Sequence, residues 1–255
     1  MRGNLGGSPG GTNGAVADAD SLLAPLAEAP HRSALLLDVD GTLAPIVARP
    51  ELAAVPEATK AELRRLVGRY ALVAAVSGRA GDDAARLVGV PGIEAVGNHG
   101  LELDPRAENL AGELARFRES VGLPVEDKRL SLSYHYREAP DPDAARAALE
   151  DVARSAEEAG LMPRWGRMVL GIRPPVDTDK GVAVRTLLAR SQATRALYAG
   201  DDTTDLDAFA GLRDAGLEHT VCVAVASDEG PTELRDGADV VVDGPEAMAG
   251  LLARL

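Results

Sequence analysis

Short apolar runs recur along the chain and are separated by amphipathic stretches. The runs lie at 34–39, 71–76, 93–96, 195–199, 220–226 and 239–242. Continuous apolar runs of this length are typical of strands that are buried on both faces of a parallel sheet. Between them, spacings such as Leu63, Leu66 and Tyr70 predict helices with one buried face. Strands alternating with helices predict an α/β fold built on a doubly wound parallel sheet.

The pattern changes between about 104 and 175. Residues 128–137 place Leu and Tyr at every second position, which predicts an antiparallel strand with one wet face. Asp141 and Pro142 have the residue types that open a helix, and Gly160 is the type that ends one. We therefore expect a smaller α+β domain at 105–174, inserted into a core domain that comprises 19–104 and 175–255.

The first residues have a different character. Residues 1–14 are so rich in Gly, with Asn, Ser and Pro, that they cannot bury enough apolar surface to offset the entropy of ordering. We expect a disordered tail over 1–18, followed by a helix at 19–28. No run approaches the roughly 18 apolar residues of a membrane span.

Composition and charge limit the possible partners. The net charge is −13 and there is no basic tract, which argues against nucleic acid or an anionic membrane as a partner. The single cysteine, Cys222, lies in an apolar run and is expected to be a packed core thiol. The absence of disulfides and of a signal peptide predicts a cytoplasmic protein, which we take to be a monomer acting on a small molecule.

Polar side chains directly follow several of the predicted strands. These residues are Asp38, Asp40, Ser77, Asp201, Asp202 and Asp205. The carboxyl ends of parallel strands gather at one edge of the sheet, where ligands bind, so we expect these side chains to meet. Carboxylates at this density favour a hard cation, and Mg²⁺ is the natural choice beside a phosphate. The alternative is a set of solvated turn residues.

The first pair of aspartates suggests a reaction. One carboxylate can attack phosphorus while a second acid protonates the leaving oxygen, and Asp38 and Asp40 have suitable types and spacing. Ser77 and Lys180 could hold the phosphoryl oxygens, the first as a donor and the second as a charge. A solvated lysine at the start of a helix is the alternative for Lys180.

Taken together, these residues resemble the haloacid-dehalogenase-like phosphotransferase superfamily. The motifs are Asp38-Val39-Asp40-Gly41-Thr42, then Ser77, then Lys180, then Gly200-Asp201-Asp202 with Asp205, in the family's order. The resemblance implies a Mg²⁺-dependent phosphatase with Asp38 as nucleophile and Asp40 as general acid and base. It also implies that Asp38, the Asp40 backbone carbonyl and Asp201 bind the metal, supported by Asp202 or Asp205.

The sequence segments between these motifs resemble those of trehalose-6-phosphate phosphatases. They include Leu43-Ala44-Pro45-Ile46, Ser77-Gly78-Arg79, Gly97-Asn98-His99-Gly100-Leu101-Glu102, Tyr134-His135-Tyr136-Arg137 and Arg173-Pro174-Pro175. The resemblance implies that the insert is a cap that closes on the sugar, and that Glu126, Lys128 and Arg137 contact the sugar. The alternative for each is an exposed strand charge. Further candidates for substrate binding are Gly78, Arg79, Asn98 and His99, although His99 could brace the hinge instead.

Two positions depart from that family. Gly171 stands where the family typically has Glu, and a glycine has no side chain to accept a hydrogen bond from a sugar hydroxyl. Leu206 stands where Glu is frequent. The leading hypothesis is hydrolysis of trehalose 6-phosphate, and Gly171 keeps open a related sugar or pseudodisaccharide phosphate. A non-catalytic sugar-phosphate-binding subunit is disfavoured, because Asp38, Asp40 and Asp201 are all present.

Overall fold

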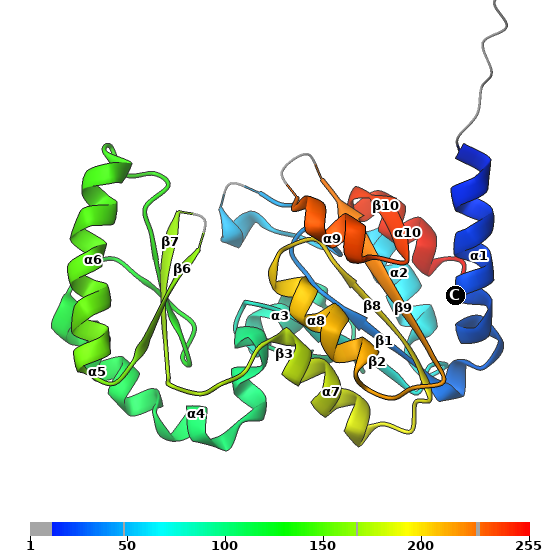
Figure 1. Cartoon of the computed structure of the whole chain (residues 1–255), viewed down its shortest axis with the longest axis horizontal. Helices are drawn as coiled ribbons and strands as arrows, with labels where there is room; N and C mark the ends of the chain where they lie inside the picture. Colours follow the sequence, from blue (N-terminus) through cyan, green and yellow to red (C-terminus); the bar gives the residue numbers. More distant parts are fainter. Residues whose placement is uncertain (1–11, 48, 167, 228–229) are drawn as a thin grey trace, which may run out of the picture.

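The computed structural model describes residues 12–47, 49–166, 168–227 and 230–255, and its centre is a six-stranded parallel sheet (Figure 1). The strands are β1 (Ser33–Leu37), β2 (Leu72–Val76), β3 (Glu94–Val96), β8 (Arg195–Gly200), β9 (His219–Ala226) and β10 (Val240–Asp243). Their order across the sheet is β10-β9-β8-β1-β2-β3, and every neighbouring pair is parallel. The predicted doubly wound sheet is confirmed, with strands within two residues of the expected ranges.

Helices cover both faces of this sheet. One layer contains α1 (Thr12–Glu28), α2 (Glu57–Leu66), α3 (Gly81–Val88) and α10 (Gly244–Leu252), and the other contains α7 (Lys180–Arg190), α8 (Thr204–Arg213) and α9 (Thr232–Gly237). Successive residues of β1 alternate between the two layers: Leu35 packs on the first and Leu36 on the second. Burial on both faces explains why β1 is a continuous apolar run.

The segment between β3 and α7 forms a separate α+β unit. It contains α4 (Pro105–Asn109), α5 (Ala111–Val121), β4 (Glu126–Asp127), β5 (Leu132–His135), α6 (Pro142–Glu158), β6 (Met162–Gly166) and β7 (Val169–Arg173). The four strands form an antiparallel sheet in the order β4-β5-β7-β6. Residues such as Phe117, Tyr134 and Leu149 give it a hydrophobic core of its own. We refer to 105–174 as the cap segment.

Some element boundaries differ from those that the sequence predicts. The predicted strand at 128–137 is shorter, because Arg129 has a left-handed φ of 66° and turns the chain before β5 begins. The predicted alternation is nevertheless present, since Leu130, Leu132, Tyr134 and Tyr136 are all buried. Helices α4, α5 and α9 were not predicted. They are short or weakly patterned; α5 buries only Leu114 and Phe117.

The beginning of the chain also differs from the expectation. Helix α1 begins at Thr12, inside the range 1–18 that we predicted as a tail, and residues 1–11 lie outside the described residues. Its sequence is rich in Ala, which favours a helix, and Leu23 and Leu26 anchor it on the central sheet. Pro25 lies within the helix, and its carbonyl accepts a hydrogen bond from Arg195 Nη1 at 2.6 Å.

Two expectations about single features can be checked. Cys222 is fully buried in β9, and burial raises the pKa of its thiol to about 12, as suits a packed core residue. Within the described ranges, the helices are all too short or too polar to cross a membrane.

Candidate active site

The carboxyl ends of β1 and β8 lie side by side, and this brings the first and last motifs together. Leu37 is opposite Ala199 in the parallel register, and Asp38 N donates to Ala199 O at 2.9 Å. The turn after β1 requires glycine, since Gly41 has a φ of 82°. A Cβ at Gly41 would also lie 2.0 Å from Asp201 Oδ2. The glycine therefore lets the β1 turn pass directly over the Asp201 carboxylate.

A buried lysine links two of the aspartates. Lys180 follows Asp179, which caps α7 by accepting from Val182 N at 2.8 Å. Lys180 Nζ lies 2.7 Å from Asp38 Oδ1 and 2.7 Å from Asp205 Oδ1, and its side chain is only 3% exposed. Burial opposes its charge, but the two carboxylates outweigh burial and raise the pKa of Lys180. The alternative of a solvated lysine is therefore wrong.

Asp205 organises the loop between β8 and α8. Its Oδ1 accepts from Lys180 and from Tyr198 OH, the latter at 2.7 Å. Its Oδ2 accepts from the backbone N–H groups of Asp201 and Asp202, each at 2.9 Å. These four hydrogen bonds occupy the acceptor sites of the Asp205 carboxylate, so Asp205 fixes the conformation of the loop. Tyr198 was missed by the sequence analysis because its hydroxyl is hidden within an apolar strand run.

Three carboxylates are close enough to share a cation. Among the described residues, ligand atoms of Asp38, Asp201 and Asp205 lie within 4.8 Å of one another, and all three residues are buried. Burial raises the pKa of Asp38 to about 7 and that of Asp201 to about 9, and the nearby Asp205 carboxylate reinforces both shifts. The three carboxylates can carry more negative charge than the single Lys180 neutralises, and buried oxygen donors of this kind suit a hard divalent cation.

The other two predicted metal ligands lie outside this group. The Asp40 carboxylate forms a bidentate pair with Arg79, with Nε–Oδ2 at 2.6 Å and Nη2–Oδ1 at 2.7 Å. The Asp202 carboxylate is exposed and accepts from Thr203 Oγ1 at 2.9 Å. Their side chains therefore belong to the rim of the site, because each is drawn to a nearby donor.

The second motif lies next to Asp38, at the end of β2. Ser77 is 1% exposed, and its Oγ accepts from Arg79 N at 3.1 Å. A Cβ at Gly78 would lie 2.7 Å from the ring of His99, so glycine is needed for this approach. Burial, together with the charge of Lys180, lowers the pKa of His99 to about 3 and keeps the ring neutral.

Asn98 and His99 lie where the chain leaves the core for the cap segment. The turn η3 (Asn98–Leu103) begins with three left-handed residues, at φ 52° for Asn98, 52° for His99 and 96° for Gly100. Asn98 Nδ2 donates to Lys128 O at 3.1 Å, and Ser131 Oγ donates to Asn98 Oδ1 at 2.6 Å. Such a conformation is costly for non-glycine residues and persists here because these bonds hold it.

The three predicted sugar contacts are on the cap segment. Glu126 Oε2 lies 2.8 Å from His135 Nε2 and 3.5 Å from Lys128 Nζ. Burial opposes its ionisation, but these contacts prevail and lower the pKa of Glu126. Arg137 lies in an exposed turn after β5. Glu126 and Lys128 are thus neighbours, whereas Arg137 stands apart from them, and His135 is a neighbour that the sequence analysis did not single out.

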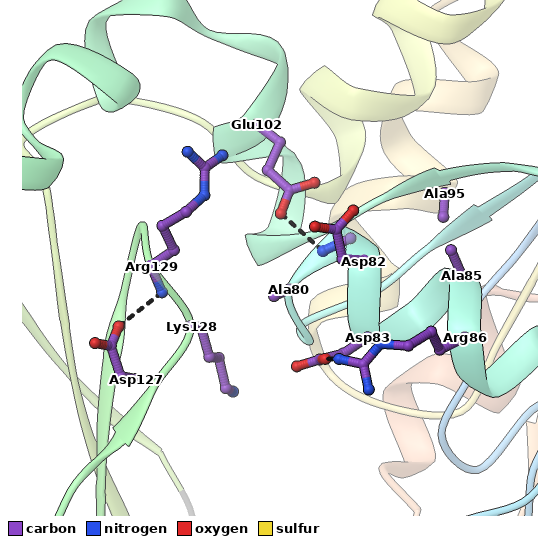
Figure 2. Close-up of a pocket in the computed structure, with 11 residues that line it drawn as sticks. Ala80, Asp82, Asp83, Ala85, Arg86, Ala95, Glu102, Asp127, Lys128 and Arg129 are labelled. Atoms are coloured by element: carbon purple, nitrogen blue, oxygen red, sulfur yellow. Dashed lines mark hydrogen bonds and ion pairs between the residues drawn. The ribbon is translucent and has the colours of Figure 1, made fainter.

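A cavity of about 360 Å³ separates the start of α3 from the turn at 127–129 (Figure 2). Glu102 borders it and accepts from Gly81 N at 2.8 Å and from Gly97 N at 2.9 Å. Charged side chains of both signs line the space, including Asp82 and Lys128. Polar walls on both the core and the cap segment suit a hydroxyl-rich ligand.

The fold and this arrangement at the sheet edge define the class of protein. A haloacid dehalogenase-like hydrolase from Bacteroides thetaiotaomicron aligns with a TM-score of 0.57 over 87% of this chain and 98% of that chain, at 15% identity. Identity this low indicates a shared fold only. The chain has the haloacid-dehalogenase-like fold, as its motifs predicted.

The comparisons also identify the family within this fold class. The family model described as trehalose-phosphatase matches residues 36–115 and 114–238, and the chain belongs to this family. The trehalose-phosphate phosphatase of Mycobacterium avium (strain 104) is 32% identical over 221 residues, 76% of this chain and 54% of that protein. An Aspergillus fumigatus trehalose-6-phosphate phosphatase structure aligns with a TM-score of 0.60 at 26% identity, over 92% of this chain and 96% of that chain. The chain spans about half the length of the curated relatives it matches.

The raised pKa values predict how stability depends on pH. In the folded state, the pKa values of Asp38 and Asp201 lie above the ordinary value of 3.8, so both carboxylates bind protons more tightly there than in the unfolded state. Without divalent cations, the contribution of these two carboxylates to the free energy of unfolding should therefore be highest below about pH 4 and fall as pH rises through 7 and 9, by at most about 1.4 kcal/mol per pH unit for each proton. The lowered pKa of His99 contributes the opposite slope below about pH 6.5, so the effect is measured as a difference between variants. Added Mg²⁺ should restore stability, increasingly so at high pH.

Denaturant unfolding of chelator-treated protein from pH 4 to 9 measures this effect. Asp201→Asn should flatten the profile and remove much of the Mg²⁺ effect. The exposed Asp236→Asn is the matched control and should keep both. A difference in unfolding free energy between wild type and Asp201→Asn that stays constant with pH and ignores Mg²⁺ contradicts the assignment.

Proposed function

We propose that this protein is a Mg²⁺-dependent phosphatase that hydrolyses trehalose 6-phosphate to trehalose and phosphate. The observation that carries the proposal is the buried Lys180 between Asp38 and Asp205, beside Asp201, in a chain of the trehalose-phosphatase family. A buried cation among carboxylates at the edge of a parallel sheet suits a phosphoryl group that must be held and attacked.

Asp38 is the proposed nucleophile. Its carboxylate attacks phosphorus, the bond to the sugar oxygen breaks, and an aspartyl phosphate forms, which water then hydrolyses. Lys180 orients Asp38, opposes the rise in its pKa that burial causes, and donates to the phosphoryl oxygens, and Ser77 is placed to donate from the neighbouring strand end. A divalent cation bound by Asp38 and Asp201, with the Asp40 backbone carbonyl, would neutralise charge on the phosphoryl group.

Asp40 is the proposed proton donor. Its carboxyl gives a proton to the leaving sugar oxygen and later takes one from water. Both oxygens of the Asp40 carboxylate are engaged by Arg79, so the pair must separate before Asp40 can reach the leaving oxygen. Thus Asp40 changes roles when the site fills.

The cap segment, 105–174, is proposed to hinge on η3 and close over the sugar, with 19–104 and 175–255 as the core domain. Glu126, Lys128 and Arg137 would contact sugar hydroxyls, while Asn98 and His99 support the hinge beside Gly78 and Arg79. Closure excludes water and brings the sugar to the catalytic edge. The partner is a small sugar phosphate, and a cytoplasmic monomer remains our prediction.

The direct test is phosphate release from trehalose 6-phosphate and a panel of sugar phosphates, with Mg²⁺ and with chelator. Asp38→Asn should fold normally and lose turnover by roughly a thousandfold or more, because the amide cannot attack phosphorus. Asp236→Asn should match the wild type. Absence of turnover on every sugar phosphate would refute the enzyme, whereas preference for a substrate other than trehalose 6-phosphate would refute only the narrower proposal.

The role of the cap is tested separately. Glu126→Ala should raise KM for trehalose 6-phosphate by about tenfold, since a lost charged hydrogen bond costs about 1.5–3 kcal/mol, and should affect a small phosphate ester much less. Steady-state kinetics on both substrates measure the difference. The control is Glu150→Ala, at an exposed position on α6. An equal loss on both substrates would contradict a sugar contact by Glu126.

A further inference from the structure

The cap sheet has one covered face and one open face. Helices α5 and α6 lie on the side away from the core, so the other face is turned toward the core (Figure 1). Leu132, Tyr134, Leu170 and Ile172 are buried toward the helices, and the residues between them point to the open face. One row across the strands in register is Glu126, Ser133, Gly171 and Arg164. This row is therefore on the face of the sheet that is turned toward the core.

Gly171 lies in the middle of that row, and its backbone conformation does not require glycine. Its φ is not in the left-handed region. A Cβ there would lie 3.4 Å from Arg164 O and 4.0 Å from Leu132 O, which is ordinary contact. Glycine inside a strand weakens the strand, and nothing in the fold requires it here. The missing side chain therefore leaves space on the open face between Ser133 and Arg164.

Arg164 borders this space and has no acidic partner in the described part of the chain. It is exposed and makes no hydrogen bond or ion pair with the residues that the structure describes. The carboxylate in its row, Glu126, is on the opposite edge strand and is already engaged by His135 and Lys128. In a chain with 40 acidic and 27 basic residues, an arginine left without a carboxylate on an inner face is unexpected.

Arg173 adds a second positive charge on the same face. It is two residues beyond Gly171 on β7, so it is a diagonal neighbour of Arg164, at about 7–8 Å by strand geometry. Its Nη1 donates to Thr178 O at 3.2 Å, but its Nε is buried and has no partner within the described part of the chain. Two guanidinium groups thus flank the Gly171 position with donors that no described residue satisfies.

We propose that Arg164 and Arg173, with the space at Gly171, form an anion subsite in the cap. The preferred substrate is then a sugar phosphate with a second anionic group on the sugar farther from the reacting phosphate. The inference rests on the proposed function, since the reacting phosphate at Asp38 fixes which end of the substrate meets the cap. Guanidinium groups bind phosphate and carboxylate through paired hydrogen bonds, whereas a neutral sugar would leave both charges unpaired.

Steady-state kinetics on trehalose 6-phosphate and trehalose 6,6′-bisphosphate test the subsite. For the wild type, KM for the bisphosphate should be lower by about tenfold or more. Because the bisphosphate has two equivalent reacting ends, a ratio of about twofold is statistical and counts against the subsite. Arg164→Gln should reduce the ratio to that statistical value. Arg154→Gln, on α6 away from the open face, is the matched control and should keep the wild-type ratio.

A second variant uses the space itself. Gly171→Glu places a carboxylate between Ser133 and Arg164, where a side chain fits, and should reverse the preference in favour of trehalose 6-phosphate. An unchanged KM ratio in both variants would overturn the subsite even if the protein is a phosphatase. If the wild type hydrolyses no sugar phosphate, the proposed function fails. Calorimetric binding of the bisphosphate to wild type and Arg164→Gln then decides the subsite, which equal affinities would refute.

Discussion

The site depends on one buried ion group, the Lys180 ammonium between Asp38 and Asp205. Removing these charges from water is costly, and the cost is met only because each carboxylate lies 2.7 Å from Nζ and Asp205 accepts three further hydrogen bonds. The network fixes α7, β1 and the β8 loop relative to one another. Among the described residues, Asp201 has no cationic side-chain partner, so its carboxylate is left for a metal.

A second constraint couples the cap segment to the core. Asn98 bonds to the turn after β4, while Glu102 binds the backbone of Gly81 and Gly97. The same short turn therefore contacts both the cap and the loop that carries Ser77. Movement of the cap segment must break or rearrange these hydrogen bonds. The position of the sugar contacts and the shape of the loop that carries Ser77 are therefore linked.

Much of this arrangement followed from sequence. Buried strands ending in Asp38, Ser77 and Asp201 predicted the sheet and its catalytic edge, because apolar runs and strand-end chemistry are local signals. The pairing of Asp40 with Arg79 and the role of Tyr198 were not predictable, since both depend on contacts between distant elements. Weakly patterned helices such as α5 were missed for lack of periodicity. Gly171 was visible in the sequence, but only the strand register associates it with Arg164.

The central claim is that Asp38, oriented by Lys180, forms a covalent bond to phosphorus. The most direct measurement is mass spectrometry of protein quenched in acid during turnover of trehalose 6-phosphate with Mg²⁺. The account predicts a phosphoryl adduct on the peptide that contains Asp38, located at that residue and absent from Asp38→Asn. Turnover with no adduct, or an adduct on another residue, would contradict it.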